Sequence, residues 1–123
     1  MGMNSMAIPV TTDGSGNATG YGYRSVQGQL MAVHWNVGTC VAGVDVTIST
    51  EGATASKTHL TLTDANSSAM YYPRDILHSE AGAALTGTNG GDRGMPLFVG
   101  RPKVVVAQGG ATKTGTVTIY WIE

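Results

Sequence analysis

Residues 44–50 read Val-Asp-Val-Thr-Ile-Ser-Thr, and this alternation of apolar and polar side chains decides the fold class. A period of two places every second side chain on the same face of a β-strand, so the apolar residues of this stretch share one face. Residues 58–63 alternate in the same way, with Leu60 and Leu62 on one face and His59 on the other. A polar segment with a glycine separates the two stretches, which therefore predict an antiparallel β-hairpin.

A second pair of strands is predicted near the C-terminus, at residues 101–107 and 116–122. The segment between them contains Gly109 and Gly110, so we expect a second hairpin with a glycine-containing loop. Both stretches carry apolar side chains on both faces, which is unusual for a strand with one face in water. We expect the second face to be covered by another layer of strands or by another subunit.

The N-terminal part predicts further strands, around residue 10 and over residues 18–24 and 27–35. Because proline has no backbone N–H, Pro9 favours an edge strand or an extended arm over a central strand. We therefore expect residues 1–12 to form an N-terminal arm that adds to a neighbouring sheet.

The section from residue 66 to residue 94 is the least regular part of the chain. It allows a single turn of helix at residues 75–79. The glycine-rich loop at residues 87–94 has no apolar pattern, so we expect it to be exposed.

These elements predict one domain over residues 1–123, an all-β fold with seven or eight short antiparallel strands. The architecture is either a β-sandwich or a jelly-roll-like barrel, and the sequence does not separate them. No composition break or fixed repeat indicates a domain boundary.

Charged residues make up only 12% of the 123 residues, and the formal net charge is −1. This charge excludes the basic character of a nucleic-acid-binding protein, so no nucleic-acid partner is expected. Leu, Ile, Val and Phe number 24, which indicates a small core. Near neutrality favours association over a solitary state. No apolar run suits a membrane span and no signal peptide is apparent, so we expect synthesis in the cytoplasm and no membrane partner.

The residues that carry chemistry do not form a recognisable site. His34, His59 and His78 lack the spacing with which one strand or helix brings two imidazoles onto a metal, so no metal or cofactor is expected. Cys40 is the only cysteine, which excludes an intramolecular disulfide and favours a structural role. No serine lies in a nucleophile-elbow motif, and the carboxylates are scattered. We therefore expect that the protein is not an enzyme.

The aromatic residues are more informative. With a single Phe in the chain, we expect Trp35 or Trp121 to fill the interior. Tyr23, Tyr71 and Tyr72 are then left as interface candidates, because tyrosine supplies a large rigid surface with a polar tip. The nearby arginine at position 74 suits a bidentate salt bridge, either within this chain or with a partner.

Three parts of the chain carry a resemblance to known proteins: residues 8–13 through 28–30, residues 72–74 with 82–85, and residues 103–110 leading to 113–116. Together they resemble a family of small virion proteins of tailed bacteriophages. The resemblance covers most of the chain from about residue 8 onward, and the Met-rich heptapeptide at the start lies outside it. These motifs are structural and contain no catalytic signature.

The resemblance implies a capsid decoration (cement) protein on the virion surface, with the major capsid protein and further copies of itself as partners. A homotrimer is the first expectation and a dimer the second. A neck or tail component, or a glycan-binding adhesion module of the virion, is the alternative. The expected partner-binding residues are Ile8, Pro9, Val10, Tyr23, Tyr71, Tyr72, Arg74, Asn89, Asp92 and Arg93.

Overall fold

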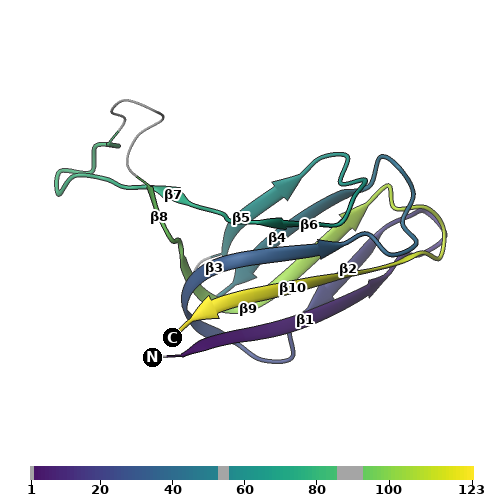
Figure 1. Ribbon diagram of the computed structural model, residues 1–123, viewed down its shortest axis with the longest axis horizontal. Coiled ribbons are helices and arrows are strands. Elements are labelled where there is room, and N and C mark those ends of the chain that lie inside the picture. The colour runs from purple at the N-terminus through teal and green to yellow at the C-terminus, as the bar shows by residue number, and fades with distance from the viewer. Residues whose placement is uncertain (1, 53–55, 86–92) are drawn as a thin grey trace.

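The alternating stretch that decides the fold class forms β4 (Asp45–Glu51), in which Val46 and Ile48 are fully buried. The computed structural model describes residues 2–52, 56–85 and 93–123. In these ranges every regular element is a β-strand, and the pairings are antiparallel. Figure 1 shows an all-β, sandwich-like fold, as the sequence predicts.

The strands form two layers that face each other. The front layer, nearer the viewer in Figure 1, contains β1 (Met3–Thr11), β10 (Thr114–Ile122), β3 (Val26–Asn36) and β6 (Ala69–Tyr71). The back layer contains β2 (Ala18–Tyr21), β9 (Leu97–Ala107), β4 and β5 (Ser56–Leu62). Two short strands, β7 (Asp75–Ile76) and β8 (Arg93–Gly94), pair with each other outside both layers.

The two layers are joined along one side and closely packed along another. The first residues of β3 pair with the first residues of β9, from Val26 opposite Gly100 to Gln29 opposite Leu97. These two long strands therefore begin together and then diverge into opposite layers. On the other side β2 approaches β1 so closely that a Cβ on Gly20 would lie 2.8 Å from a methyl group of Val10.

The core lies between the layers and is built from the inward-facing residues of both. Trp35 and Trp121 are both fully buried, so the expectation that a tryptophan fills the interior is confirmed. The Trp35 indole donates a hydrogen bond to the carbonyl of Ala65 at 3.0 Å, which satisfies its polar atom. The larger aliphatic residues around the tryptophans include Ile8, Leu30, Val33, Ile48, Val104, Val106, Val117 and Ile119.

The first predicted hairpin is confirmed and the second is wrong. β4 pairs with β5, from Val46 opposite Leu62 to Glu51 opposite Ser56. In contrast, β9 and β10 lie in different layers. Both edges of β9 are taken by β2 and β4, and both edges of β10 by β1 and β3. The loop between them crosses the sandwich, with left-handed backbone at Gln108, Gly110 and Thr112.

The predicted N-terminal arm is also wrong for the residues that form β1. This strand pairs with β10 along its whole length, from Met3 opposite Ile122 to Thr11 opposite Thr114. Its inward side chains are buried in the core of the same chain, so the strand buries apolar surface by pairing within its own sheet. The edge-strand alternative for Pro9 is the one that the structure shows.

No helix forms at residues 75–79. Asp75 and Ile76 pair with Gly94 and Arg93 as β7 and β8, and His78 forms an isolated antiparallel bridge with Ala84. A single helical turn would leave most of its backbone groups without partners, whereas strand pairing satisfies them.

Gly28 allows β3 to pass close to the C-terminal strand. A Cβ at this position would collide with the carbonyl group of Ile122, close to the register shift at which β3 has one extra residue, Met31. We expect Gly28→Ala to lower the free energy of unfolding by about 2 kcal/mol, since backbone atoms must move. Gly14→Ala is the control, because a Cβ there would meet nothing within 4 Å. Chemical unfolding that shows equal losses for the two variants would contradict this prediction.

Candidate functional site

The expected partner-binding residues of β1 do not share one environment. Ile8 is 2% exposed and Val10 is 5% exposed, so both belong to the core and are not available to a partner. The sequence expectation for them is wrong, because β1 turns every second residue inward. Pro9 lies between them and is exposed.

The three tyrosines of the expected contact set also differ in their exposure to solvent. Tyr23 is 75% exposed and Tyr72 is 64% exposed, so both can meet a partner. Tyr71 is half-buried and packs against the core, which makes it a structural residue at the edge of the sandwich. Its position in β6, opposite Val33, explains the difference from Tyr72, which follows the strand.

Arg74 makes its hydrogen bonds within this chain. Its guanidinium donates to the carbonyl of Met31 at 3.0 Å and to that of Pro73 at 2.7 Å. These bonds hold the segment after β6 against β3. Of the sequence alternatives, an intramolecular role is therefore observed, although its acceptors are carbonyl groups and not a carboxylate.

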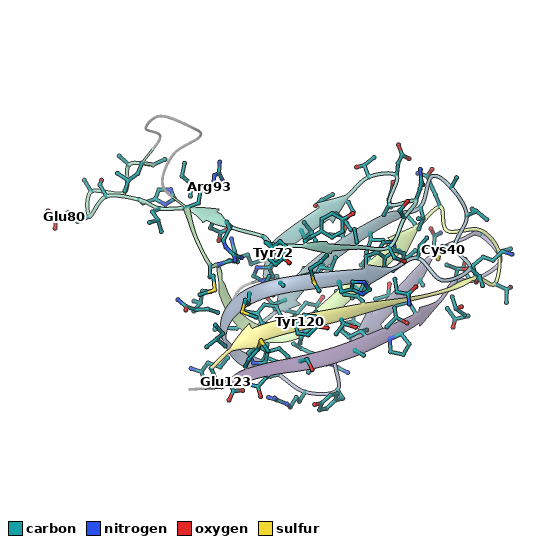
Figure 2. All side chains as sticks on the ribbon, in the orientation of Figure 1. Cys40, Tyr72, Glu80, Arg93, Tyr120 and Glu123 are labelled. Carbon is teal, nitrogen blue, oxygen red and sulfur yellow. The ribbon has the colours of Figure 1, made fainter. Side chains whose placement is uncertain are left out.

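The expected contact loop is described only in part. Asn89 and Asp92 lie outside the described residues. Arg93 is exposed and begins β8. Figure 2 places Glu80 at the end of the molecule that lies away from Cys40, and Arg93 nearer to the sandwich.

The feature that the sequence did not anticipate is an extension, residues 75–85 with 93 and 94, that leaves the sandwich (Figure 1). The chain turns back on itself near its tip, where Gly82 donates to the carbonyl of Ser79 at 2.9 Å. Further back, the N–H of Leu85 donates to the carbonyl of Leu77 at 2.8 Å. Leu77 is 47% exposed and Leu85 is 36% exposed. Two leucines within a segment that lacks strand periodicity were the available signal.

The base of the extension is tied to the back layer. Lys57 of β5 forms a salt bridge with Asp75 of β7 at 2.9 Å, and both side chains are about half exposed. Next to this pair, the Nε2 atom of His59 lies 2.9 Å from the hydroxyl of the buried Thr50. The His59 ring packs edge-on against Phe98, with 5.2 Å between ring centroids.

The alternation of residues 58–63 predicts that His59 points to solvent with the other polar residues of its strand. In the structure it does not. A register shift between Ile48 and Ser49 gives β5 one extra residue there, and the imidazole lies half-buried. Its Nδ1 is buried without a hydrogen-bond partner among the described residues. Burial lowers the pKa of His59 to about 4, with a smaller lowering by the charge of Lys57 and an opposing effect of Asp75.

An open groove of about 850 Å³ lies where β3 and β9 begin, and its lining includes Arg24, Gln27, Glu51 and Glu123. Its charges are already paired within the chain. Lys103 bonds Glu51 at 2.9 Å, and this hydrogen bond raises the pKa of the lysine. Arg24 lies 3.8 Å from Glu123 and covers the Trp121 ring at 5.3 Å.

Cys40 and Asp13 each contact backbone groups of this chain. The thiol of Cys40 is half-buried and lies 3.7 Å from the carbonyl of Thr114, and burial raises its pKa. Asp13 accepts hydrogen bonds from the N–H groups of Asn17 and Ser15, which lower its pKa and form an Asx-type turn. Within residues 2–52, 56–85 and 93–123, no three His, Cys, Asp or Glu side chains gather as metal ligands would.

Comparison with protein-family models finds no match, and no curated protein matches the chain. Among the described residues, no helical segment has the length and apolar character that a membrane crossing requires.

Proposed function

We propose that this protein is a structural subunit of a tailed-bacteriophage virion, a capsid decoration protein that binds the outer surface of the major capsid lattice. The family resemblance of the sequence suggests this context, and the all-β, sandwich-like fold is compatible with it. The subunit is made in the host cytoplasm and joins the particle there, next to further copies of itself.

The extension is the observation that carries the proposal. An isolated two-stranded hairpin is marginally stable in water, so a hairpin that leaves its own sandwich needs a surface on which to pack. Among the described residues, the salt bridge from Lys57 ties the base of the extension to the back layer, while Leu77 and Leu85 are exposed. A neighbouring capsid subunit would cover these leucines and order the hairpin.

The proposed action is mechanical. A subunit that bridges adjacent capsid proteins only in the mature, expanded lattice adds interface area to that state alone. Binding then shifts the equilibrium towards the intact shell by mass action. No chemical step is assigned to the protein.

The test is the composition of purified particles. If the protein decorates the capsid, quantitative mass spectrometry of the particles will find a copy number close to that of the major capsid protein. Electron cryomicroscopy will then place it on the outer surface of the shell. A few copies per particle would support the neck or tail alternative, and complete absence from particles would overturn the proposal.

A substitution on the extension tests how the subunit attaches. We expect Leu77→Glu to weaken binding to undecorated expanded shells by at least about tenfold, because a carboxylate must be desolvated where a leucine packs. Val41→Glu is the matched control, since Val41 is 43% exposed and lies in a loop outside the extension. Both variants should melt as the natural chain does. Equal co-sedimentation of the two variants with shells would show that the extension is not the contact.

A glycan-binding module is the second candidate, favoured by the groove that Arg24 lines and by the exposed Tyr23, whose ring lies 6.0 Å from the Arg24 guanidinium. Exposed tyrosine rings stack on sugars, and Gln27 offers hydrogen-bond partners. The internal pairing of Arg24, Glu51 and Glu123 weighs against it. Binding to a glycan array that is lost in Tyr23→Ala would favour this candidate over the capsid role.

A further inference from the structure

The outer face of the front layer is organised in rows that run across its strands. The register places Met3 opposite Ile122, Ile122 opposite Gln29, and Gln29 opposite Leu97. These four residues alternate with buried neighbours, so their side chains lie on the outside. Met3 is 64% exposed and Leu97 is 67% exposed, so a row of three apolar side chains and Gln29 crosses this end of the layer and reaches the first residue of β9, where the two layers are joined.

The next two rows continue the same face. One contains Ser5, Tyr120 and Ala32 in direct register, of which Ala32 is already buried within this chain. The other is made of Ala7, Thr118, His34 and Met70. Tyr72 follows Met70 by two residues and is exposed, and Figure 2 labels it near Tyr120.

This face contains no Asp, Glu, Lys or Arg at the outward positions of its strands, all of which the structure describes. The outer face of the back layer is different. Its outward positions include Asp45, Glu51, Arg101 and Lys103, among threonines. The sandwich therefore has one face typical of a solvated surface and one face typical of a buried contact.

We propose that the outer face of the front layer binds the same face of a second copy of this chain, which gives a two-fold symmetric dimer. In such a contact the same surface patch is used by both copies, and a side chain close to the two-fold axis meets its own counterpart on the second copy. A charged residue near the axis would therefore face its own like charge, and a face without charged residues is what self-association requires. Methionine and tyrosine also suit a contact that must adapt to its own copy.

The size of the face meets the minimum for a specific contact. Three strands about 4.8 Å apart, each rising about 3.4 Å per residue over the length of β1, cover about 440 Å², and the three residues of β6 add about 50 Å². Two such faces bury about 1,000 Å² in total, the smallest area expected of a specific protein–protein interface. Arg74 lies at the margin, where its bonds to the Met31 and Pro73 carbonyls keep it within its own chain.

The dimer differs from the trimer that the sequence favours. A flat sheet packs on another flat sheet through one extended face, which a two-fold axis satisfies. A trimer needs two different patches on each subunit, and the charged outer face of the back layer does not match the uncharged face in front.

The inference rests on the proposed role as an assembly subunit, but its test uses the isolated protein. Analytical ultracentrifugation of the full chain should give a mass near twice 12.7 kDa. Thr118→Lys places a charge at the centre of the face, and we expect it to weaken the dimer by about 100-fold. Thr47→Lys is the matched control, because Thr47 is a half-buried, outward-facing residue of a central strand in the back layer and should leave the mass unchanged.

Folding of both variants is checked by thermal melting. If Thr118→Lys does not fold, Ala7→Glu on the exposed side of the edge strand β1 takes its place. A monomeric natural chain, a trimer, or a dimer that survives both substitutions would overturn the inference. A monomer that still joins particles would contradict the dimer alone, and a dimer absent from particles would contradict the decoration role alone.

Discussion

Replacement of Trp35 by alanine is expected to lower the free energy of unfolding by about 4 kcal/mol, a large part of the total for a domain of this size. The indole is fully buried between the layers and packs against Gly115, where a Cβ would lie 2.5 Å from its ring. Few neighbours can collapse into the space, because strands on both sides are held in register. Urea unfolding followed by circular dichroism measures the loss.

Two further variants separate packing from hydrogen bonding in this effect. Trp35→Phe keeps most of the ring but leaves the Ala65 carbonyl without its donor, so we expect a loss of about 2 kcal/mol. Tyr23→Ala removes a ring that is 75% exposed and should change stability by about 0.5 kcal/mol or less. A Trp35→Ala variant as stable as Tyr23→Ala would show that the tryptophan does not lie in the core.

Acid is expected to destabilise the fold through His59. The unfolded chain binds a proton at the ordinary pKa of 6.5, whereas the folded chain keeps the imidazole neutral down to about 4. The unfolded state therefore holds more protons between these values, and the free energy of unfolding falls as the pH drops from 6.5 towards 4. With allowance for the partial exposure of the ring, we expect a loss of about 2 kcal/mol.

The surroundings of His59 explain why the folded chain disfavours the charged imidazole. A charged imidazole would have two N–H donors, and only Nε2 has an observed partner, the hydroxyl of Thr50. Lys57 opposes the added charge and Asp75 favours it. His59→Gln can still bond Thr50 but does not titrate, so its stability should change less between pH 7 and 4.5. His78→Gln on the extension is the control and should keep the natural pH dependence. Parallel pH profiles for the natural chain and His59→Gln would contradict this account.

The strand content and the core were predictable from local patterns. Val46 and Ile48 are buried because alternation alone determines which face they share, whatever strand lies beside them. The shortage of other large apolar residues predicted a tryptophan in the interior, Trp35 or Trp121, and the structure buries both. The β4–β5 pairing was also predictable, since a short polar turn connects two strands that alternate in phase.

Strand pairing between distant segments was not predictable in this way. β9 and β10 are close in sequence and apolar on both faces, which is also what a hairpin would show. They lie in different layers because β1, β2, β3 and β4 occupy their edges. Competition for an edge depends on the whole sheet, and no single stretch records it.

Only some of the candidate contact residues were correctly predicted to be exposed. Tyr72 and Tyr23 are exposed as an interface requires, but Ile8 and Val10 are buried in their own core. Apolar character does not distinguish a core residue from a contact residue, because burial stabilises both. The uncharged face could be recognised only when the register placed Thr118 opposite His34 and Tyr120 beside them. The extension could be recognised only when β7 paired with β8 outside both layers.

The sequence by itself determined that this chain forms short antiparallel strands with a small apolar core and little surface charge. These properties follow from the spacing of side chains along one strand and from composition. The tertiary structure decided which strands share a layer, that His59 turns inward at a register shift, and that an apolar extension leaves the sandwich. The physical reason is that each of these outcomes depends on contacts between segments far apart in the chain, whose free energies add up only in the assembled sheet.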